Sequence, residues 1–197
     1  MNDCNLKIIV SALEECLSNN GHTLLAIDGR CGGGKTYLSG CLESIFECNI
    51  VHMDDFFLPF ELRNEERMSQ IGGNIHKERF LEEVLQPLVN NERVSYRPYE
   101  CKSGTFSDEI SFVPGKLIVI EGTYSCMSEF SDYYDLKIFV EVSDEVRKDR
   151  LKRRCKNGEY ERFTNIWIPR EEAYFDKCNV MCRCDYVIDT SDFDKEI

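Results

Sequence analysis

The stretch Ile27-Asp-Gly-Arg-Cys-Gly-Gly-Gly-Lys-Thr36 decides the fold of this 197-residue chain. Gly29, Gly34, Lys35 and Thr36 occupy the four fixed positions of the pattern G-x-x-x-x-G-K-[ST], which is typical of phosphate-binding loops. In such a loop, successive backbone N–H groups surround a phosphate, and glycines permit the tight curve. The lysine reaches the outer phosphates and the hydroxyl binds Mg²⁺. The pattern therefore predicts a site for a nucleoside triphosphate.

The residues on both sides of this loop have the expected periodicity. Residues 24–28 form an apolar run suited to a buried parallel strand. Residues 35–46 carry apolar side chains at helical spacing, which predicts a helix whose positive dipole end faces the phosphate. We therefore expect the nucleotide contacts to come from Gly29, Gly32, Gly33, Gly34, Lys35, Thr36 and Tyr37.

Strand and helix patterns alternate along the rest of the chain. Apolar runs predict further strands at 49–53, 117–121, 136–142 and 186–189. Helical spacing predicts helices over 5–17, 77–89 and 143–155, and a short helix with Pro169 in its first turn. We expect loops over 54–75, 100–115 and 156–168, and a short strand at 94–99 interrupted by Pro98. The alternation predicts an α/β domain with a parallel sheet covered on both faces.

The composition argues against several classes of partner. The chain has 24 Lys and Arg against 36 Asp and Glu, a formal net charge of −12, which disfavours nucleic acid. No apolar run approaches the roughly 18 residues that span a membrane, and the N-terminus lacks the pattern of a signal peptide. The 11 cysteines are scattered and odd in number, so we expect reduced thiols and a cytoplasmic location. We interpret Cys31 as a tolerated small residue rather than a reactive thiol.

Carboxylates follow two of the predicted strands. Asp54 and Asp55 come after the strand at 49–53, and Glu121 ends the strand at 117–121. In open parallel sheets, ligands bind beyond the carboxyl ends of the strands. A carboxylate there can accept a proton from a hydroxyl group or support Mg²⁺. The structural alternatives are that the two aspartates cap a helix and that Glu121 is only a charged residue at the end of a strand. Aromatic residues nearby, such as Tyr124, suit a planar ring or ordinary loop packing.

Basic residues cluster near the C-terminal third of this acidic chain. Arg150 and Arg154 recur at helical spacing, and Arg162 follows in the next segment. A mobile arginine-bearing lid can neutralise the charge of a transferring phosphoryl group and exclude water. The alternative is a solvated helix face, which is the interpretation we favour for Arg147 and Lys148.

Together, these segments resemble the uridine kinase-like branch of the P-loop nucleoside kinases over most of the chain. The likeness rests on the phosphate loop, the segment Asp54-Asp-Phe-Phe57, Tyr99-Glu100, Glu121-Gly122 and the basic helix. It implies a three-layer P-loop fold with a five-stranded parallel sheet in the order 2-3-1-4-5. It also implies one domain over 1–197, with an acceptor-binding insertion at about 54–115 and a lid at about 153–170.

The resemblance further implies ATP- and Mg²⁺-dependent phosphoryl transfer to the 5′-hydroxyl of a nucleoside, uridine or cytidine. It makes Asp54 the general base, with Lys35, Arg150 and Arg154 stabilising the transferring group. It places Mg²⁺ at Thr36 and Glu121, with Asp55 in support. The acceptor contacts that it implies are Asp54, Phe57, His76, Tyr99, Glu100, Tyr124 and Arg162. The chain departs from the family twice: Glu100 replaces an aspartate, and the ribose-binding aspartate has Asn74 and His76 as its nearest counterparts.

Two alternatives stay open. The acceptor can be another alcohol, such as pantothenate or nicotinamide riboside, or the protein can be a regulator that binds ATP without transferring phosphate. The convergence of Asp54 and Glu121 argues against a regulator, because sensing needs no base. We expect a small-molecule acceptor and neither nucleic acid nor membrane as a partner. Four points stay open. They are whether the donor is ATP or GTP, whether the base is Asp54 or Asp55, which lid arginine acts, and whether the protein forms a homo-oligomer.

Overall fold

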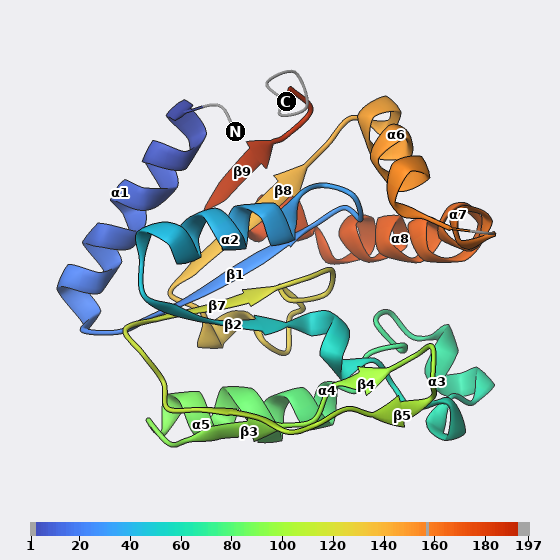
Figure 1. Ribbon diagram of the computed structural model, residues 1–197, viewed down its shortest axis with the longest axis horizontal. Helices are drawn as coiled ribbons and strands as arrows, with labels where there is room; N and C mark the ends of the chain where they lie inside the picture. The colour runs from blue at the N-terminus through green and yellow to red at the C-terminus, as the bar shows by residue number, and fades with distance from the viewer. Residues whose placement is uncertain (1–2, 157, 193–197) are drawn as a thin grey trace.

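A parallel sheet of five strands forms the centre of the molecule (Figure 1). The computed structural model describes residues 3–156 and 158–192. The strands are β1 (Thr23–Gly29), β2 (Cys48–His52), β7 (Leu117–Glu121), β8 (Leu136–Glu141) and β9 (Tyr186–Asp189). They lie in the order β2-β7-β1-β8-β9, and every neighbouring pair is parallel. Counted along the chain within this sheet, the order is 2-3-1-4-5, and the predicted α/β fold class is confirmed.

Helices cover both faces of the sheet. Leu25 and Ile27 of β1 share a buried cluster with residues of α1 (Asp3–Asn20) and α2 (Lys35–Ile45). On the other face, Leu24 and Ala26 share a cluster with residues of α4 (Lys77–Phe80) and α8 (Ile168–Cys178). Successive side chains of a strand point to opposite faces, so burial on both sides requires the continuous apolar runs found in the sequence.

The predicted helix at 77–89 is present and contains one wider turn. Helix α4 continues through a π turn at Leu81–Leu85 into α5 (Gln86–Val89). Pro87 has no N–H to donate within the helix, and π turns accommodate such interruptions of the regular ladder. The buried side chains are those that the helical spacing predicts: Phe80, Val84, Leu85 and Leu88.

Two segments expected to be loops contain short elements. Residues 54–75 include 3₁₀ turns at Met53–Phe56 and Phe60–Leu62 and the helix α3 (Glu65–Ser69). Four short strands follow, paired outside the main sheet as β3–β6 and β4–β5. Their bounds are β3 (Val94–Tyr96), β4 (Tyr99–Glu100), β5 (Thr105–Phe106) and β6 (Ile110–Phe112). Only the strand at 94–99 was predicted, because β5 and β6 are two and three residues long, mostly exposed, and lie in a polar segment.

The expectation of a loop over 156–168 was wrong. After α6 (Asp144–Arg154), the helix α7 (Glu159–Arg162) continues through a π turn at Phe163–Trp167 into α8, and α9 (Val180–Arg183) follows. No side chain of α7 or of the π turn is fully buried, but Tyr160, Phe163 and Trp167 recur at helical spacing, a signal that the expectation of a loop overlooked. None of the helices within residues 3–156 and 158–192 is long and apolar enough to cross a membrane.

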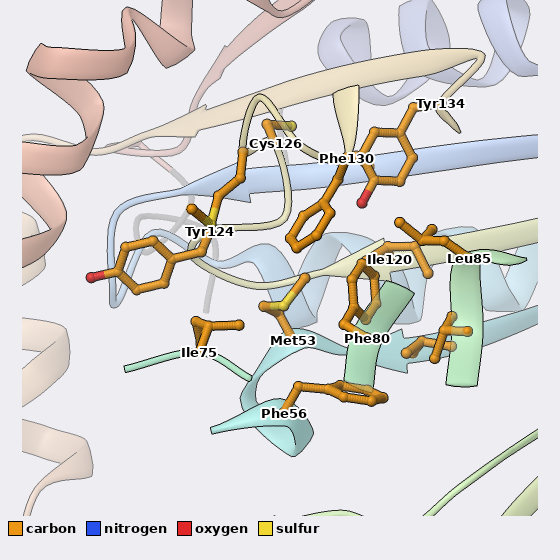
Figure 2. Close-up of a cluster of buried hydrophobic side chains, with 14 of the residues drawn as sticks. Met53, Phe56, Ile75, Phe80, Leu85, Ile120, Tyr124, Cys126, Phe130 and Tyr134 are labelled. Atoms are coloured by element: carbon orange, nitrogen blue, oxygen red, sulfur yellow. The ribbon is translucent and has the colours of Figure 1, made fainter. Parts of the chain in front are cut away.

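Residues 54–115, between β2 and β7, are called the inserted segment below, and they share a core with the sheet. Figure 2 shows Met53, Phe56, Phe80 and Phe130 gathered beside Ile120 of β7. The ring of Phe80 lies edge-on to the rings of Phe56 and Phe130, at centroid distances of 5.2 Å and 4.9 Å. Edge-to-face aromatic pairs add stability beyond the area that they bury. This packing fixes the residues that follow β2 against the end of β7, where the carboxylates predicted from the sequence lie.

Candidate active site

The phosphate-binding loop connects β1 to α2 as predicted. Its glycines adopt backbone conformations that other residues rarely take: φ is 138° at Gly29, 71° at Gly32 and 91° at Gly34. A Cβ atom on Gly29 would lie 2.1 Å from the carbonyl oxygen of Val140, so the loop is pressed against β8 at this point. The loop therefore has the curvature and close backbone approach that surround a phosphate group.

Replacing Gly29 with alanine is expected to lower the free energy of unfolding by about 2–4 kcal/mol, since the new Cβ must move the Val140 backbone and φ is unfavourable. Gly40→Ala is the matched control, because a Cβ at Gly40 meets no atom within 4 Å and α2 would gain helix propensity. Urea unfolding of both variants measures the difference. Equal stability of Gly29→Ala and the wild type would contradict this packing.

Lys35 and Thr36 begin α2 and face the loop. The Lys35 ammonium donates to the carbonyl oxygens of Gly29 and Arg30, at 2.7 and 3.0 Å, and to the hydroxyl of Thr123 at 3.3 Å. Thr36 donates from Oγ1 to Oε1 of Glu121 at 3.1 Å. The lysine is thus held within the loop, and the hydroxyl and carboxylate expected at Mg²⁺ are already adjacent.

A buried aspartate that the sequence analysis did not single out anchors the loop. Asp28, at the end of β1, accepts from the backbone N–H of Gly29 at 2.7 Å and of Cys126 at 2.9 Å, and from the hydroxyl of Tyr174 at 2.7 Å. Burial raises the pKa of Asp28, and these three hydrogen bonds oppose the rise. Asp28 therefore joins the loop to α8 and to the segment after β7. The sequence could have identified Asp28 by its position inside an otherwise apolar strand.

Glu121 is the centre of a small polar group at the ends of β2 and β7. Besides Thr36, its Oε1 atom contacts Nδ1 of His52 at 2.6 Å. Burial would raise the pKa of Glu121, but the hydrogen bond from His52, the charge of Lys35 and the Thr36 hydroxyl together lower it. An ionised carboxylate beside a hydroxyl is a set of hard oxygen ligands, which fits Mg²⁺ completed by phosphate oxygens and water. His52 is a further residue that the sequence analysis did not identify.

The His52–Glu121 pair predicts a pH-dependent stability in Mg²⁺-free buffer. The hydrogen bond to Glu121 raises the pKa of His52, so the pair stabilises the fold below pH 6.5 and loses that contribution as the pH rises through the higher folded pKa. The effect is expected to be at most about 1 kcal/mol, because the His52 side chain is 44% exposed. Unfolding curves of the wild type and His52→Asn between pH 6 and 9 measure it. A difference that does not change with pH would contradict the coupling.

The two adjacent aspartates point in different directions. Asp54 lines the main cavity, whereas Asp55 accepts a hydrogen bond from the Tyr96 hydroxyl at 3.3 Å and does not line it. The Asp54 side chain is exposed toward the cavity. Desolvation by the surrounding protein raises the pKa of Asp54, as does the charge of Glu121, while Lys35 and Arg154 lower it. Asp54 therefore lines the cavity that contains the phosphate loop, and Asp55 does not.

A single large cavity of about 870 Å³ joins the loop to the inserted segment and to α7 and α8. In Figure 1, α6–α8 (orange) and the short elements around α3, β4 and β5 lie at the same end of the sheet, on the right of the view. The loop contributes Gly32, Gly34, Lys35 and Thr36 to the wall, and the inserted segment contributes Asp54, Phe57, Phe60, Arg63 and Asn74. The phosphate loop and the Asp54 carboxylate therefore open into one space.

The predicted lid arginines have three different environments. Arg150 donates to the carbonyl oxygen of Gly32 at 3.2 Å and to that of Thr190 at 2.7 Å, so it supports the loop. Arg154 lines the cavity, and its guanidinium lies 5.2 Å from the ring centroid of Phe163. Arg162 also lines the cavity. Arg150 lines the cavity as well, so all three have the position expected of groups that contact a phosphoryl group.

Residues of α7 and of the π turn touch the inserted segment across the cavity. The rings of Phe57 and Trp167 lie 6.2 Å apart, and Lys102 forms an ion pair with Glu159 at 3.3 Å. The Lys102 side chain is 91% exposed, so its ion pair contributes little. The two contacts nevertheless show that residues of α7 and the π turn reach over the cavity to the opposite wall.

Arg147 differs from the solvated side chain that we expected. It is buried and binds Glu171 at 3.2 Å and Glu172 at 2.6 Å, both on α8. Glu171 in turn accepts from the backbone N–H of Cys31 at 3.1 Å. Burial and the charge of Glu171 raise the pKa of Cys31, which agrees with an unreactive thiol. Arg147 was misjudged because helical spacing alone does not reveal that α8 packs on this face.

Several residues implied as acceptor contacts lie outside the main cavity. Tyr99 and Glu100 line an adjoining hollow together with Asp54 and Phe57, and Glu100 binds the hydroxyl of Ser107 at 2.6 Å. His76 caps α4, accepting from the backbone N–H of Arg79 at 3.4 Å, and lines neither space. Tyr37, which the sequence predicted as a nucleotide contact, is 55% exposed on α2 and lines neither space. Tyr124, with φ of 80°, does line the main cavity, as does Asn74.

Comparison with known proteins agrees with this geometry. A family model described as "Phosphoribulokinase / Uridine kinase family" matches residues 24–178. No curated protein sequence matches the chain.

Three solved structures share the fold at identities below 25%. A protein described as a possible uridine kinase from Bacillus stearothermophilus is 20% identical, with a TM-score of 0.71 over 96% of this chain and 100% of that one. A candidate fructose transport system kinase from Silicibacter sp. TM1040 is 19% identical, with a TM-score of 0.73 over 92% and 98%. YFH7 from Saccharomyces cerevisiae is 10% identical, with a TM-score of 0.63 over 94% and 97%. With its phosphate loop and the family match over most of its length, the chain belongs to the phosphoribulokinase and uridine kinase family of P-loop kinases.

Proposed function

We propose that the protein transfers the γ-phosphoryl group of ATP, with Mg²⁺, to a hydroxyl group of a small molecule. The observation that carries this proposal is that Asp54 and the phosphate-binding loop line the same cavity. A site that only binds a nucleotide needs no carboxylate facing the phosphate loop. A site that activates a hydroxyl group for attack on a phosphate does need one.

The loop supplies the phosphate-donor half of the site. Its backbone N–H groups and Lys35 hold the β- and γ-phosphates, and Thr36 and Glu121 hold the metal ion. Bound there, Mg²⁺ would supply positive charge against the negative charge that develops during transfer. Arg154 and Arg162 contribute further positive charge from the lid, and Arg150 keeps Gly32 in place.

Asp54 supplies the acceptor half of the chemistry. Its carboxylate accepts the proton of the acceptor hydroxyl as that oxygen attacks the γ-phosphate. Desolvation raises the pKa of Asp54, which makes it a stronger base, while the charges of Lys35 and Arg154 oppose the rise. We assign residues 54–115 to acceptor binding and residues 153–170 to the lid, within one domain over 1–197 that acts in the cytoplasm.

Uridine and cytidine are the acceptors that the resemblance to nucleoside kinases suggests. The ring pair of Phe57 and Trp167 at the cavity supports a planar acceptor. The positions of His76 and Glu100 outside the main cavity weaken the nucleoside assignment and favour another alcohol. Pantothenate and nicotinamide riboside therefore belong in the same set of candidate acceptors.

An acceptor panel tests the proposal. ADP release is measured with ATP and Mg²⁺ in the presence of uridine, cytidine, pantothenate, nicotinamide riboside or simple polyols. Acceptor-dependent ADP release, with one phosphoester formed per ADP, supports the proposal. ATP binding without transfer to any acceptor would contradict it and support a nucleotide-binding regulator.

A further inference from the structure

We propose that His52 is a positioning residue for the metal site, and that its imidazole N–H holds the Glu121 carboxylate in the orientation that binds Mg²⁺. This inference rests on the binding of Mg²⁺ and nucleotide in the proposed function, but it does not require transfer to an acceptor. It extends the site to a side chain that lines neither the main cavity nor the adjoining hollow.

The pairing of β2 with β7 brings His52 to Glu121. The two residues are register partners, and they form the last pair of this parallel ladder. The chain stays in close contact beyond the pair: a Cβ atom on Gly122 would lie 2.7 Å from Cβ of Met53, and φ is 140° at Gly122. The N–H of Gly122 also donates to the carbonyl oxygen of Ile27 at 3.0 Å. Backbone packing therefore fixes the two points from which the imidazole and the carboxylate meet.

Both hydrogen bonds to the Glu121 side chain end on one of its two oxygens. Nδ1 of His52 lies 2.6 Å from Oε1, and Oγ1 of Thr36 donates to the same atom at 3.1 Å. An ionised carboxylate can only accept, so Nδ1 is the donor in the first of these bonds. Oε2 accepts no hydrogen bond from residues 3–156 and 158–192. The two donors thus set the rotation of the carboxylate and leave Oε2 for the metal ion or a water molecule bound to it.

His52 acts through Glu121 and is not a ligand itself. Glu121 and Thr36 line the main cavity, whereas His52 does not. The Glu121 side chain is 7% exposed and that of His52 is 44% exposed, so the histidine supports the carboxylate from outside the cavity. Mg²⁺ prefers oxygen ligands, and Nδ1 is already bonded to Glu121.

Loss of the imidazole removes one of the two anchors of the carboxylate. Hydrogen-bond partners orient the carboxylates that ligate metals, and their removal usually weakens metal binding by about 10–100-fold. Because the Thr36 hydroxyl still donates to Oε1, we expect the lower end of this range, about tenfold. The phosphate loop keeps its own contacts, so nucleotide binding without metal should not change.

Substitutions of two histidines test the assignment. His52→Ala removes the imidazole, whereas His52→Asn keeps an N–H donor close to the position of Nδ1 and should recover most of the metal affinity. His52→Phe keeps the ring without a donor, and it must show the same loss if His52→Ala does not fold. His22→Ala is the matched control, because His22 is exposed just before β1 and lines neither space.

Metal-dependent nucleotide binding separates positioning from a merely structural role. Trp167 is the single tryptophan of the chain and lines the cavity, so its fluorescence reports ADP binding without turnover. In the wild type and in His22→Ala, Mg²⁺ should lower the Kd for ADP below its value in EDTA. In His52→Ala this gain should be about tenfold smaller or lost, with the Kd in EDTA unchanged. A Kd that rises equally in EDTA and in Mg²⁺, or a gain that keeps its wild-type value, would overturn the inference.

The Mg²⁺ dependence of turnover is the second readout. The Mg²⁺ concentration that gives half of the maximal rate should rise about tenfold in His52→Ala, with kcat at saturating Mg²⁺ within a few-fold of the wild type. Loss of the Mg²⁺ gain in ADP binding, in a protein that transfers phosphate to no acceptor, would uphold the inference and contradict the proposed transfer. Wild-type ADP binding that Mg²⁺ does not strengthen would overturn the inference, whatever the rate of transfer.

Discussion

Replacement of Asp54 by asparagine is expected to lower kcat by about 10²–10⁴-fold, the usual contribution of a general base. Asparagine has nearly the same shape but cannot accept the hydroxyl proton at this position. Because Asp54 lies on the cavity wall and not within the phosphate loop, the dissociation constant for ATP should change less than threefold. Steady-state turnover with the best acceptor, combined with ATP titration by Trp167 fluorescence, measures both quantities.

Asp55→Asn is the matched control for Asp54→Asn. Asp55 is the adjacent residue, has the same chemistry and binds Tyr96 instead of lining the cavity, so its loss should cost no more than a few-fold in kcat. The pH profile adds a second criterion. Enclosure raises the pKa of Asp54, so the acid limb of kcat/KM should lie above the ordinary aspartate range. A larger defect in Asp55→Asn than in Asp54→Asn would contradict the assignment of the base.

Replacement of Lys35 by alanine is expected to lower kcat/KM by about 10²–10³-fold or more, since a preorganised charge on the transferring phosphate is lost. The same change should weaken ATP binding, because the ammonium contacts the phosphates before as well as during transfer. Initial rates at varied ATP and acceptor, together with fluorescence titration of ATP, separate the two effects.

The control for Lys35→Ala removes a lysine on the exposed face of α6. Lys148→Ala should have the activity of the wild type, because that side chain is exposed and lines neither space. Circular dichroism must show that Lys35→Ala is folded, since Lys35 also bonds to the loop carbonyls. Turnover of folded Lys35→Ala within a few-fold of the wild type would contradict the role of the loop in transfer.

The fold was predictable because the central strands β1, β7 and β8 are largely buried on both faces. Continuous apolar runs such as residues 117–120 exclude most alternatives, and the pattern Gly29–Thr36 defines the strand, loop and helix around it. The same logic located Glu121 and the Asp54–Asp55 pair, because the carboxyl ends of parallel strands meet at one edge. The ends of β1, β2 and β7 do bring these residues to one region.

The details of the site depended on contacts that a linear pattern does not contain. The choice between Asp54 and Asp55 depends on a 3₁₀ turn, in which successive side chains point in different directions. The ion pairs of Arg147 depend on the packing of α8, and His52 contacts Glu121 only because β2 pairs with β7.

The most direct test of the proposed function is transfer of label from [γ-³²P]ATP to an acceptor. The wild type should form a labelled phosphoester that depends on Mg²⁺ and acceptor, and Asp54→Asn should bind ATP normally but form at least about a hundredfold less product. Tight ATP binding by the wild type, with no labelled product from any alcohol of the panel, would contradict phosphoryl transfer and show a nucleotide-binding protein without kinase activity.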